Sequence, residues 1–227
     1  MNDNEILDLY FSRKKEMEFN KLMLSVGYKE IEEDVRIYVD NICSIPVKIV
    51  LDYINNKCPK YIIEAKDVYQ FSKFKDTTDG VCSVLLKNNS EGIGYKELGE
   101  RLQNDGKERT DLAKAKYGEN HFKMAEELGL GFREGRHDCY LSAIGNLFLE
   151  MEEETKRCLL TRLILRSKLI VRLYKEASKG EVRLEILLYD LSESTYIRRR
   201  TNVRTVIEEL KKTTEFDFEY FATKIIY

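Results

Sequence analysis

The chain has 227 residues, of which 43% are hydrophobic and 34% charged, and its 38 basic and 40 acidic side chains leave a net charge of −2. This apolar content is enough for a folded core, which excludes a wholly disordered chain. The near-zero total excludes a uniformly basic nucleic-acid coat, although it leaves room for a local basic face. The length allows one large domain or two small ones.

Membrane and secretory proteins are also excluded as classes. No apolar run approaches the length of a transmembrane helix, and residues 1–8 are polar and acidic rather than typical of a signal peptide. The cysteines are odd in number and never in C-x-x-C spacing, which argues against a disulfide framework or a structural zinc site. We therefore expect a cytoplasmic protein with free thiols. The five cysteines are Cys43, Cys58, Cys82, Cys139 and Cys158.

Residues 1–65 are expected to form an N-terminal segment of helical and mixed structure. Residues 5–23 have a helical but imperfect apolar period, whereas β-branched and aromatic residues become more frequent from Val35 onwards. The stretch 45–54 fits either a strand or a helix, and residues 61–63 are more typical of a strand. The first forty residues carry six basic and ten acidic side chains, a net charge of −4. Such a segment is poorly suited to phosphate, and we expect it to dock a partner protein or to form a homodimer.

Residues 66–152 follow the order of a winged helix. Helical patterns at 66–86, 94–102 and 111–128 precede a polar turn at 133–138, which lies between two short strand-like runs. In such a unit, two helices pack on the third and hold it rigid. The third helix then offers its outer face to a groove, while the hairpin, or wing, reaches the adjacent backbone.

The same order recurs in residues 153–227. A long helical pattern covers 155–177, an alternating run covers 181–186, residues 187–191 are ambiguous but fit a short second helix, and a third helix is expected at 195–212. The alternating aromatic residues of 216–221 indicate a strand, which would be a reduced second wing. The predicted fold class is therefore mainly α with small β-wings (α+β), in which tandem winged helices follow the N-terminal segment.

Basic residues concentrate in the second of these units. Residues 156–204 carry thirteen basic and five acidic side chains, a net charge of +8. Within the predicted third helix, Arg198, Arg199 and Asn202 are expected to face outward. Arginine matches phosphate and guanine edges and asparagine matches adenine edges, which favours contact with double-stranded DNA over a merely solvated face. The predicted DNA-binding residues of this helix are Thr195, Arg198, Arg199, Arg200, Asn202 and Arg204.

The third helix of the first unit, and the turn after it, carry the remaining predicted DNA contacts. Acidic neighbours dilute the charge there, so we expect these residues to touch phosphates. A metal role for His121 or His137 is not expected, because neither has an acidic or thiol partner at helical spacing. The predicted phosphate-binding residues are Lys114, Lys116, Lys123, Arg133 and Arg136.

One pattern is typical of a catalytic site. The sequence Tyr61-Ile62-Ile63-Glu64-Ala65-Lys66 has the apolar-strand, Glu-x-Lys form of the PD-(D/E)xK nucleases. In such a site two carboxylates bind Mg²⁺ and the lysine supports the attacking water, and Asp52 would supply the first carboxylate. A pattern of three residues also arises by chance in any charged chain. A small Mg²⁺-dependent nuclease using Asp52, Glu64 and Lys66 is thus the alternative to a protein without catalytic residues or cofactor.

Several of these segments resemble one known family. Residues 194–207 are similar to the S-T-x-x-R-R-x-x-x-V-R-x-W helix of winged-helix modules, with Ile207 near the usual tryptophan. The ending Leu128-Gly129-Leu130 and the run Tyr140-Leu141-Ser142-Ala143-Ile144-Gly145 look like the L-G-L and Y-L-T-x-x-G patterns of their first unit. Over residues 66–212, the chain resembles the tandem winged-helix DNA-binding modules that accompany type II restriction endonucleases and related defence proteins.

The predicted function is therefore sequence-selective binding of double-stranded DNA by tandem winged helices. The resemblance implies a restriction–modification or phage-defence setting, and a transcriptional regulator would use the same module. Two alternatives stay open, namely the nuclease and a protein–protein adaptor that docks through the N-terminal segment.

Overall fold

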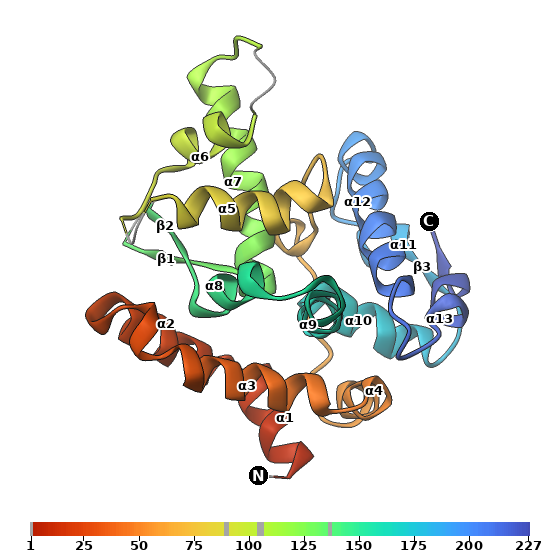
Figure 1. Cartoon of the computed structure of the whole chain (residues 1–227). Helices are drawn as coiled ribbons and strands as arrows, with labels where there is room; N and C mark the ends of the chain where they lie inside the picture. The colour runs from red at the N-terminus through yellow and green to blue at the C-terminus, as the bar shows by residue number, and fades with distance from the viewer. Residues whose placement is uncertain (1, 89–90, 104–106, 136–137) are drawn as a thin grey trace. The chain divides into compact units, whose positions relative to one another are not determined.

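The computed structural model describes residues 2–88, 91–103, 107–135 and 138–227. Of the described residues 68% are helical, which confirms the predicted mainly α class with small β elements. Figure 1 shows the arrangement of these elements. Among the described ranges, no helix combines the length and apolar character that a membrane crossing requires. The helices are α1 (Asp3–Ser12), α2 (Lys14–Val26), α3 (Glu32–Ser44), α4 (Val47–Asn56), α5 (Val81–Leu86), α6 (Tyr95–Leu102), α7 (Asp111–Leu128), α8 (Ala143–Glu150), α9 (Glu153–Leu165), α10 (Lys168–Ala177), α11 (Leu184–Leu187), α12 (Glu193–Lys211) and α13 (Glu219–Thr223).

In the described part of the chain, the strands form two small sheets of two strands each. Strands β1 (Gly131–Glu134) and β2 (Asp138–Leu141) are antiparallel, so that Gly131 lies opposite Leu141. Strands β3 (Val182–Arg183) and β4 (Ile225–Ile226) are parallel. The first sheet is a hairpin, whereas the second joins segments that are far apart in the sequence.

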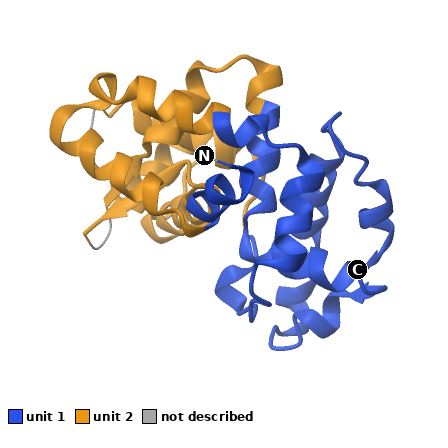
Figure 2. Ribbon diagram, turned by 90° about the horizontal axis from the view of Figure 1, so that it is seen from below, with its two compact units in different colours: residues 1–11, 41–69, 157–227 blue, residues 12–40, 70–156 orange. Residues whose placement is uncertain are grey.

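The described chain divides into two compact units (Figure 2). Unit 1 contains residues 1–11, 41–69 and 157–227, and unit 2 contains residues 12–40 and 70–156. Residues 1–65 are thus shared between the two units instead of forming a separate body. The reason is the burial of their apolar side chains within both units, for example Tyr10 in unit 1 and Phe19 in unit 2.

In unit 2, three helices and a hairpin follow one another from α5 to β2. Between α5 and α6, the Ile93 N–H donates to the Cys139 carbonyl at 3.1 Å, and the Cys139 N–H donates to the Ile93 carbonyl at 2.9 Å. This bridge adds a third strand position beside β2. Helix α7 begins after Thr110, whose hydroxyl accepts the Ala113 N–H at 3.3 Å, and ends at Gly129 with φ of 81°. The predicted stop at Gly129 is confirmed.

Helices α6 and α7 touch through their backbones. A Cβ on Gly118 would lie 2.0 Å from the Tyr95 carbonyl oxygen, and one on Gly99 would lie 1.9 Å from the Lys114 carbonyl oxygen. Only glycine permits such an approach, because any side chain would occupy the space of the facing backbone. This contact holds α7 against α6 without intervening side chains.

In unit 1, the predicted strand at 216–221 is wrong. The Asp217 carboxylate accepts the Glu219 N–H at 2.8 Å and starts α13. Phe218 and Phe221 are both buried, and their spacing of three residues fits one face of a helical turn. No second hairpin forms in this described segment, and β4 instead pairs with β3.

Residues 45–54 resolve in favour of a helix, because α4 buries Val47, Val50 and Ile54 on one face. The strand expected at 61–63 is not formed. The Tyr61 carbonyl accepts a hydrogen bond from the Arg172 guanidinium at 2.7 Å, where a strand would pair with a neighbouring backbone.

The single helix expected at 155–177 is two helices, α9 and α10. The chain turns at Ser167, whose hydroxyl donates to the Ile164 carbonyl at 2.9 Å and also pairs with the Tyr69 hydroxyl. Apolar residues continue at helical spacing through the turn, so the sequence pattern does not reveal the break.

Candidate nucleic-acid interface

Helix α12 carries most of the predicted DNA-binding residues. Its inner face buries Val203, Val206, Ile207 and Leu210. These positions recur every three or four residues and anchor the C-terminal half of the helix in unit 1. The orientation of the remaining side chains around the helix follows from this anchor.

Arg199 and Asn202 do not face outward as predicted. The Arg199 guanidinium donates to the Val68 carbonyl, and the Asn202 side-chain amide donates to the Tyr69 carbonyl at 3.1 Å. Both side chains are half-buried within unit 1. Burial, together with the neighbouring charge of Arg198, lowers the pKa of Arg199 below its usual value. The two residues therefore hold an extended segment of unit 1 against α12. These donor groups are already engaged in hydrogen bonds within the protein.

The outward face of α12 is formed by Ile197, Arg198, Thr201 and Arg204, all of which are exposed. Their spacing of one, three and four residues places them on one stripe of the helix. Arg204 lies over the Tyr227 ring, with 4.7 Å from its guanidinium carbon to the ring centroid. Stacking on an aromatic ring orients the guanidinium and leaves its N–H groups available.

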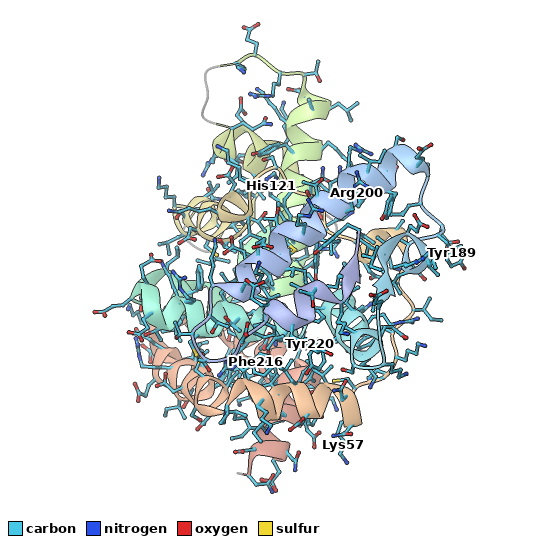
Figure 3. The ribbon with its side chains drawn as sticks, turned by 90° about the vertical axis from the view of Figure 1, so that its right-hand side faces the viewer. Lys57, His121, Tyr189, Arg200, Phe216 and Tyr220 are labelled. Carbon is cyan, nitrogen blue, oxygen red and sulfur yellow. The ribbon has the colours of Figure 1, made fainter. Side chains whose placement is uncertain are left out.

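Arg200 and Thr195 lie on the flank of this stripe. Arg200 is labelled in Figure 3. It is half-buried, and its guanidinium carbon is 5.8 Å from the centroid of the Tyr196 ring. Thr195 is half-buried near the start of the helix, where its hydroxyl receives a hydrogen bond from Ser192 at 2.9 Å. Arg200 is thus positioned by the aromatic ring one turn before it.

The arginines of α12 differ from the basic residues of unit 2 in their pairing. Within the described ranges, no carboxylate lies at ion-pairing distance from Arg198, Arg200 or Arg204. Helix α12 therefore presents positive charge that the protein itself does not compensate.

In unit 2, each described cation that was predicted to touch phosphate is ion-paired. Lys114 pairs with Glu100 at 2.6 Å, and Arg133 pairs with Glu126 at 2.8 Å. Lys116 and Lys123 both pair with the same carboxylate, at 2.8 and 2.5 Å. That carboxylate, Glu119, has its pKa lowered by the hydrogen bonds from the two lysines. Arg136 and His137 lie outside the described residues.

His121 holds the segment before α5 against α7. Its Nδ1 is 2.9 Å from the Tyr117 carbonyl, and its Nε2 is 3.2 Å from the N–H of Ser72. Because the carbonyl can only accept and the N–H can only donate, Nδ1 carries the proton and Nε2 accepts. Burial lowers the pKa of this imidazole below its usual 6.5. The geometry is that of a structural histidine.

The three residues of the nuclease alternative are not arranged on adjacent strands. Asp52 is exposed on helix α4. Glu64 and Lys66 form an exposed ion pair of 2.6 Å, and the Glu64 N–H donates to Asp67 at 3.0 Å. Among the described residues, no group of three histidine, cysteine or acidic side chains is placed to hold a metal ion. The Glu-x-Lys pattern here forms a short capped turn.

Two aromatic residues of the site were missed from the sequence. Tyr196 precedes Arg200 by four residues, so helical spacing alone points to this contact. Tyr227 lies far along the chain from Arg204, and no sequence signal connects them.

Searches of protein-family models, curated proteins and solved structures find no significant match to this chain. The assignment of a function therefore depends on the residues of the site.

Proposed function

We propose that the protein binds double-stranded DNA and that the outer face of α12 is its main contact surface. The observation that carries the proposal is that no carboxylate of the described residues lies at ion-pairing distance from Arg198, Arg200 or Arg204. A helix bearing uncompensated guanidinium groups attracts an anionic polymer and releases its condensed counterions on binding. The same number of cations in unit 2 would contribute less, because each one already interacts with a carboxylate.

The chemistry of the outer face suits a DNA groove. The major groove admits an α-helix, and guanidinium forks match guanine edges and phosphate oxygens. Thr201 adds a hydroxyl that can donate or accept, and the exposed Ile197 offers an apolar contact for a thymine methyl group. We infer a sequence-selective contact in which Arg198 and Arg204 lie closest to the groove.

The order of elements in unit 2 supports the same proposal. We infer that α5, the Ile93 bridge, α6, α7 and the β1–β2 hairpin form a winged-helix domain, because the third strand position falls between the first and second helices. In unit 1, the order α10, β3, α11 and α12 is similar, with the parallel β3–β4 pair in place of a wing. The cellular setting proposed for this activity is restriction–modification, phage defence or transcriptional regulation in the cytoplasm.

A comparison of two triple variants tests the proposal. One is Arg198→Ala/Arg200→Ala/Arg204→Ala, and the matched control is Lys116→Ala/Lys123→Ala/Arg133→Ala. Binding of a labelled random-sequence duplex is measured by fluorescence anisotropy between 50 and 200 mM salt, and circular dichroism checks the fold of each variant. Both variants lose three positive charges, so a difference between them reports position rather than net charge.

We expect the α12 variant to bind about 100-fold more weakly, as three contacts of at least about 1 kcal/mol each would require. If all three contact phosphate, the slope of log affinity against log salt falls by about 2.7. The control should lose less than tenfold. Equal losses in the two variants, or none in either, would show that α12 is not the contact surface.

A second candidate function is docking of a partner protein or a second copy through the acidic N-terminal segment. The observation that favours it is exposed apolar surface on α2 and α3 of unit 2. Its members are Met17 (58% exposed), Leu22 (40%), Leu24 (38%), Val26 (53%) and Ile37 (50%). Met17 and Leu24 are seven residues apart and share one face of α2, and an exposed apolar helix face is typical of an interaction surface.

The solution mass of the full chain and of Met17→Glu/Leu24→Glu distinguishes self-association from docking of another protein. A dimeric wild type and a monomeric variant would support a homodimer through this surface. A monomeric wild type would exclude the homodimer and leave a different partner as the proposed occupant.

A further inference from the structure

Cys43 and Cys158 form a thiol pair in unit 1. Cys43 lies in the last turn of α3 and Cys158 lies in α9, and both are partly exposed, whereas Cys58, Cys82 and Cys139 are buried. The Cys158 sulfur is 3.8 Å from the Cys43 carbonyl oxygen. The Cys158 thiol thus lies against the backbone of Cys43, although the two residues are 115 positions apart in the sequence.

A buried guanidinium lies beside this pair. Arg162, one helical turn after Cys158, donates to the Cys43 carbonyl at 3.3 Å and to the Ile45 carbonyl at 2.7 Å. Its other partner is Glu215, with 3.1 Å between Nη1 and Oε1. The cation favours a thiolate at the adjacent sulfur, and the carboxylate opposes it in part.

The two thiols differ in acidity. The adjacent Cys43 thiol and the charge of Arg162 lower the pKa of Cys158, while the adjacent Cys158 thiol and burial raise the pKa of Cys43. Burial raises the pKa of Cys58 to about 11 and that of Cys139 to about 12. Cys158 is therefore the cysteine whose environment favours the nucleophilic thiolate, and Cys43 is the neighbouring thiol.

We propose that Cys43 and Cys158 form a redox modification site, at which a hydroperoxide oxidises the pair to an intrachain disulfide. The juxtaposition of two partly exposed thiols next to a guanidinium carries this proposal. It is independent of DNA binding, because neither cysteine belongs to α12.

The reaction proceeds in two steps. The Cys158 thiolate attacks the distal peroxide oxygen, so that an S–O bond forms, the O–O bond breaks and an alcohol leaves after taking up a proton. The Cys43 sulfur then attacks the Cys158 sulfenic acid, so that the S–S bond forms, the S–O bond breaks and water leaves. Two thiols lose two electrons and two protons in total, and the hydroperoxide is reduced to an alcohol and water.

Trypsin cleaves after arginine and lysine, and the positions of these residues place the two cysteines in separate peptides. Trypsin releases Cys43 in the peptide 37–48 and Cys158 in the peptide 158–162, and each peptide contains a single cysteine. The folded full-length protein is treated with stoichiometric hydrogen peroxide, its remaining thiols are alkylated, and the non-reduced digest is analysed by mass spectrometry. We expect a cross-linked species of these two peptides, two hydrogens lighter than their sum, which disappears on reduction.

Single serine variants separate the two roles. In Cys43→Ser, we expect the sulfenic acid of Cys158 to persist and to react with dimedone. In Cys158→Ser, dimedone labelling at Cys43 should fall at least about tenfold relative to Cys158 in the other variant, because its thiol is less acidic. Cys58→Ser serves as the control and should form the cross-link as the wild type does. Circular dichroism verifies that each variant is folded.

A further probe does not require oxidation. Phenylarsine oxide binds two adjacent thiols, so one equivalent should bind the reduced wild type and Cys58→Ser but neither Cys43→Ser nor Cys158→Ser. The proposal is overturned if peroxide leaves both thiols free to alkylate in the folded wild type. It is also overturned if the cross-links join other cysteines as often as this pair.

Discussion

Glu215 accepts hydrogen bonds from both terminal nitrogens of Arg162, whose side chain is wholly excluded from solvent. A buried guanidinium without a counter-ion is costly, and removal of the partner of such a pair typically destabilises by about 3–5 kcal/mol. Glu215 is itself 32% exposed, so we expect Glu215→Gln to lower the free energy of unfolding by about 3 kcal/mol in urea titrations.

Glu208→Gln provides the control for this charge change. Glu208 pairs with Lys211 at 3.0 Å on the surface of α12, and such exposed pairs contribute about 0–1 kcal/mol. If the two variants were equally stable, the buried pair would have no special role in unit 1.

The glycine contact between α6 and α7 predicts that a single added methyl group lowers the free energy of unfolding strongly. Gly118→Ala places a Cβ 2.0 Å from the Tyr95 carbonyl, so the two helices must separate. We expect a loss of about 3 kcal/mol in the free energy of unfolding, at the upper end of the cost of overpacking. Gly94→Ala is the matched control, because no atom lies within 4 Å of a Cβ there. A Gly118→Ala protein as stable as Gly94→Ala would contradict the close approach.

Arg199 and Asn202 should affect stability rather than DNA affinity. Their side chains satisfy the carbonyls of Val68 and Tyr69, and loss of a buried partner costs about 1–3 kcal/mol. We expect Asn202→Ala to lower the unfolding midpoint in urea while its affinity for duplex DNA changes less than threefold. Arg204→Ala should show the reverse, with lower affinity and unchanged stability. A large loss of affinity in a well-folded Asn202→Ala protein would show instead that Asn202 contacts DNA.

His121 predicts a specific pH dependence of stability. Its pKa in the folded protein is lowered below 6.5 by burial, so the unfolded chain binds more protons between these two values. The free energy of unfolding contributed by His121 is therefore present above pH 6.5 and declines as the pH falls through that interval. The difference in stability between wild type and His121→Gln should shrink from pH 7.5 to pH 5. A constant difference would mean that His121 is not held in the neutral form.

Helical periodicity was the part of the fold that the sequence predicted well. The helices α7 and α12, the stop at Gly129 and the buried face from Val203 to Leu210 all follow from local spacing. The errors lie at two short segments and at the break between α9 and α10. Residues 61–63 have the composition of a strand but no partner strand among the described residues. Residues 216–221 alternate in sequence like a strand, but an Asp217 cap and the burial of two phenylalanines favour a helical turn there.

The candidate site was predicted only in part, because segments distant in the sequence supply partners for its side chains. A helical wheel places Arg199 and Asn202 outward, because it considers α12 and its main core contact alone. The extended residues Val68 and Tyr69 supply further acceptors beside the helix, and free carbonyls draw these two side chains inward. The ion pairs around Glu119 are local in sequence and were foreseeable, whereas the Arg204–Tyr227 contact was not.

By itself, the sequence determined the helical class, the concentration of basic residues before residue 204 and the order of three helices and a hairpin in unit 2. These properties depend on charge and on apolar spacing within a few turns of chain. Tertiary structure alone decided which arginines of α12 remain unpaired, how residues 1–65 divide between two units, and that Cys43 meets Cys158. Each of these depends on contacts between distant segments, whose register is set by the packing of whole cores rather than by local preference.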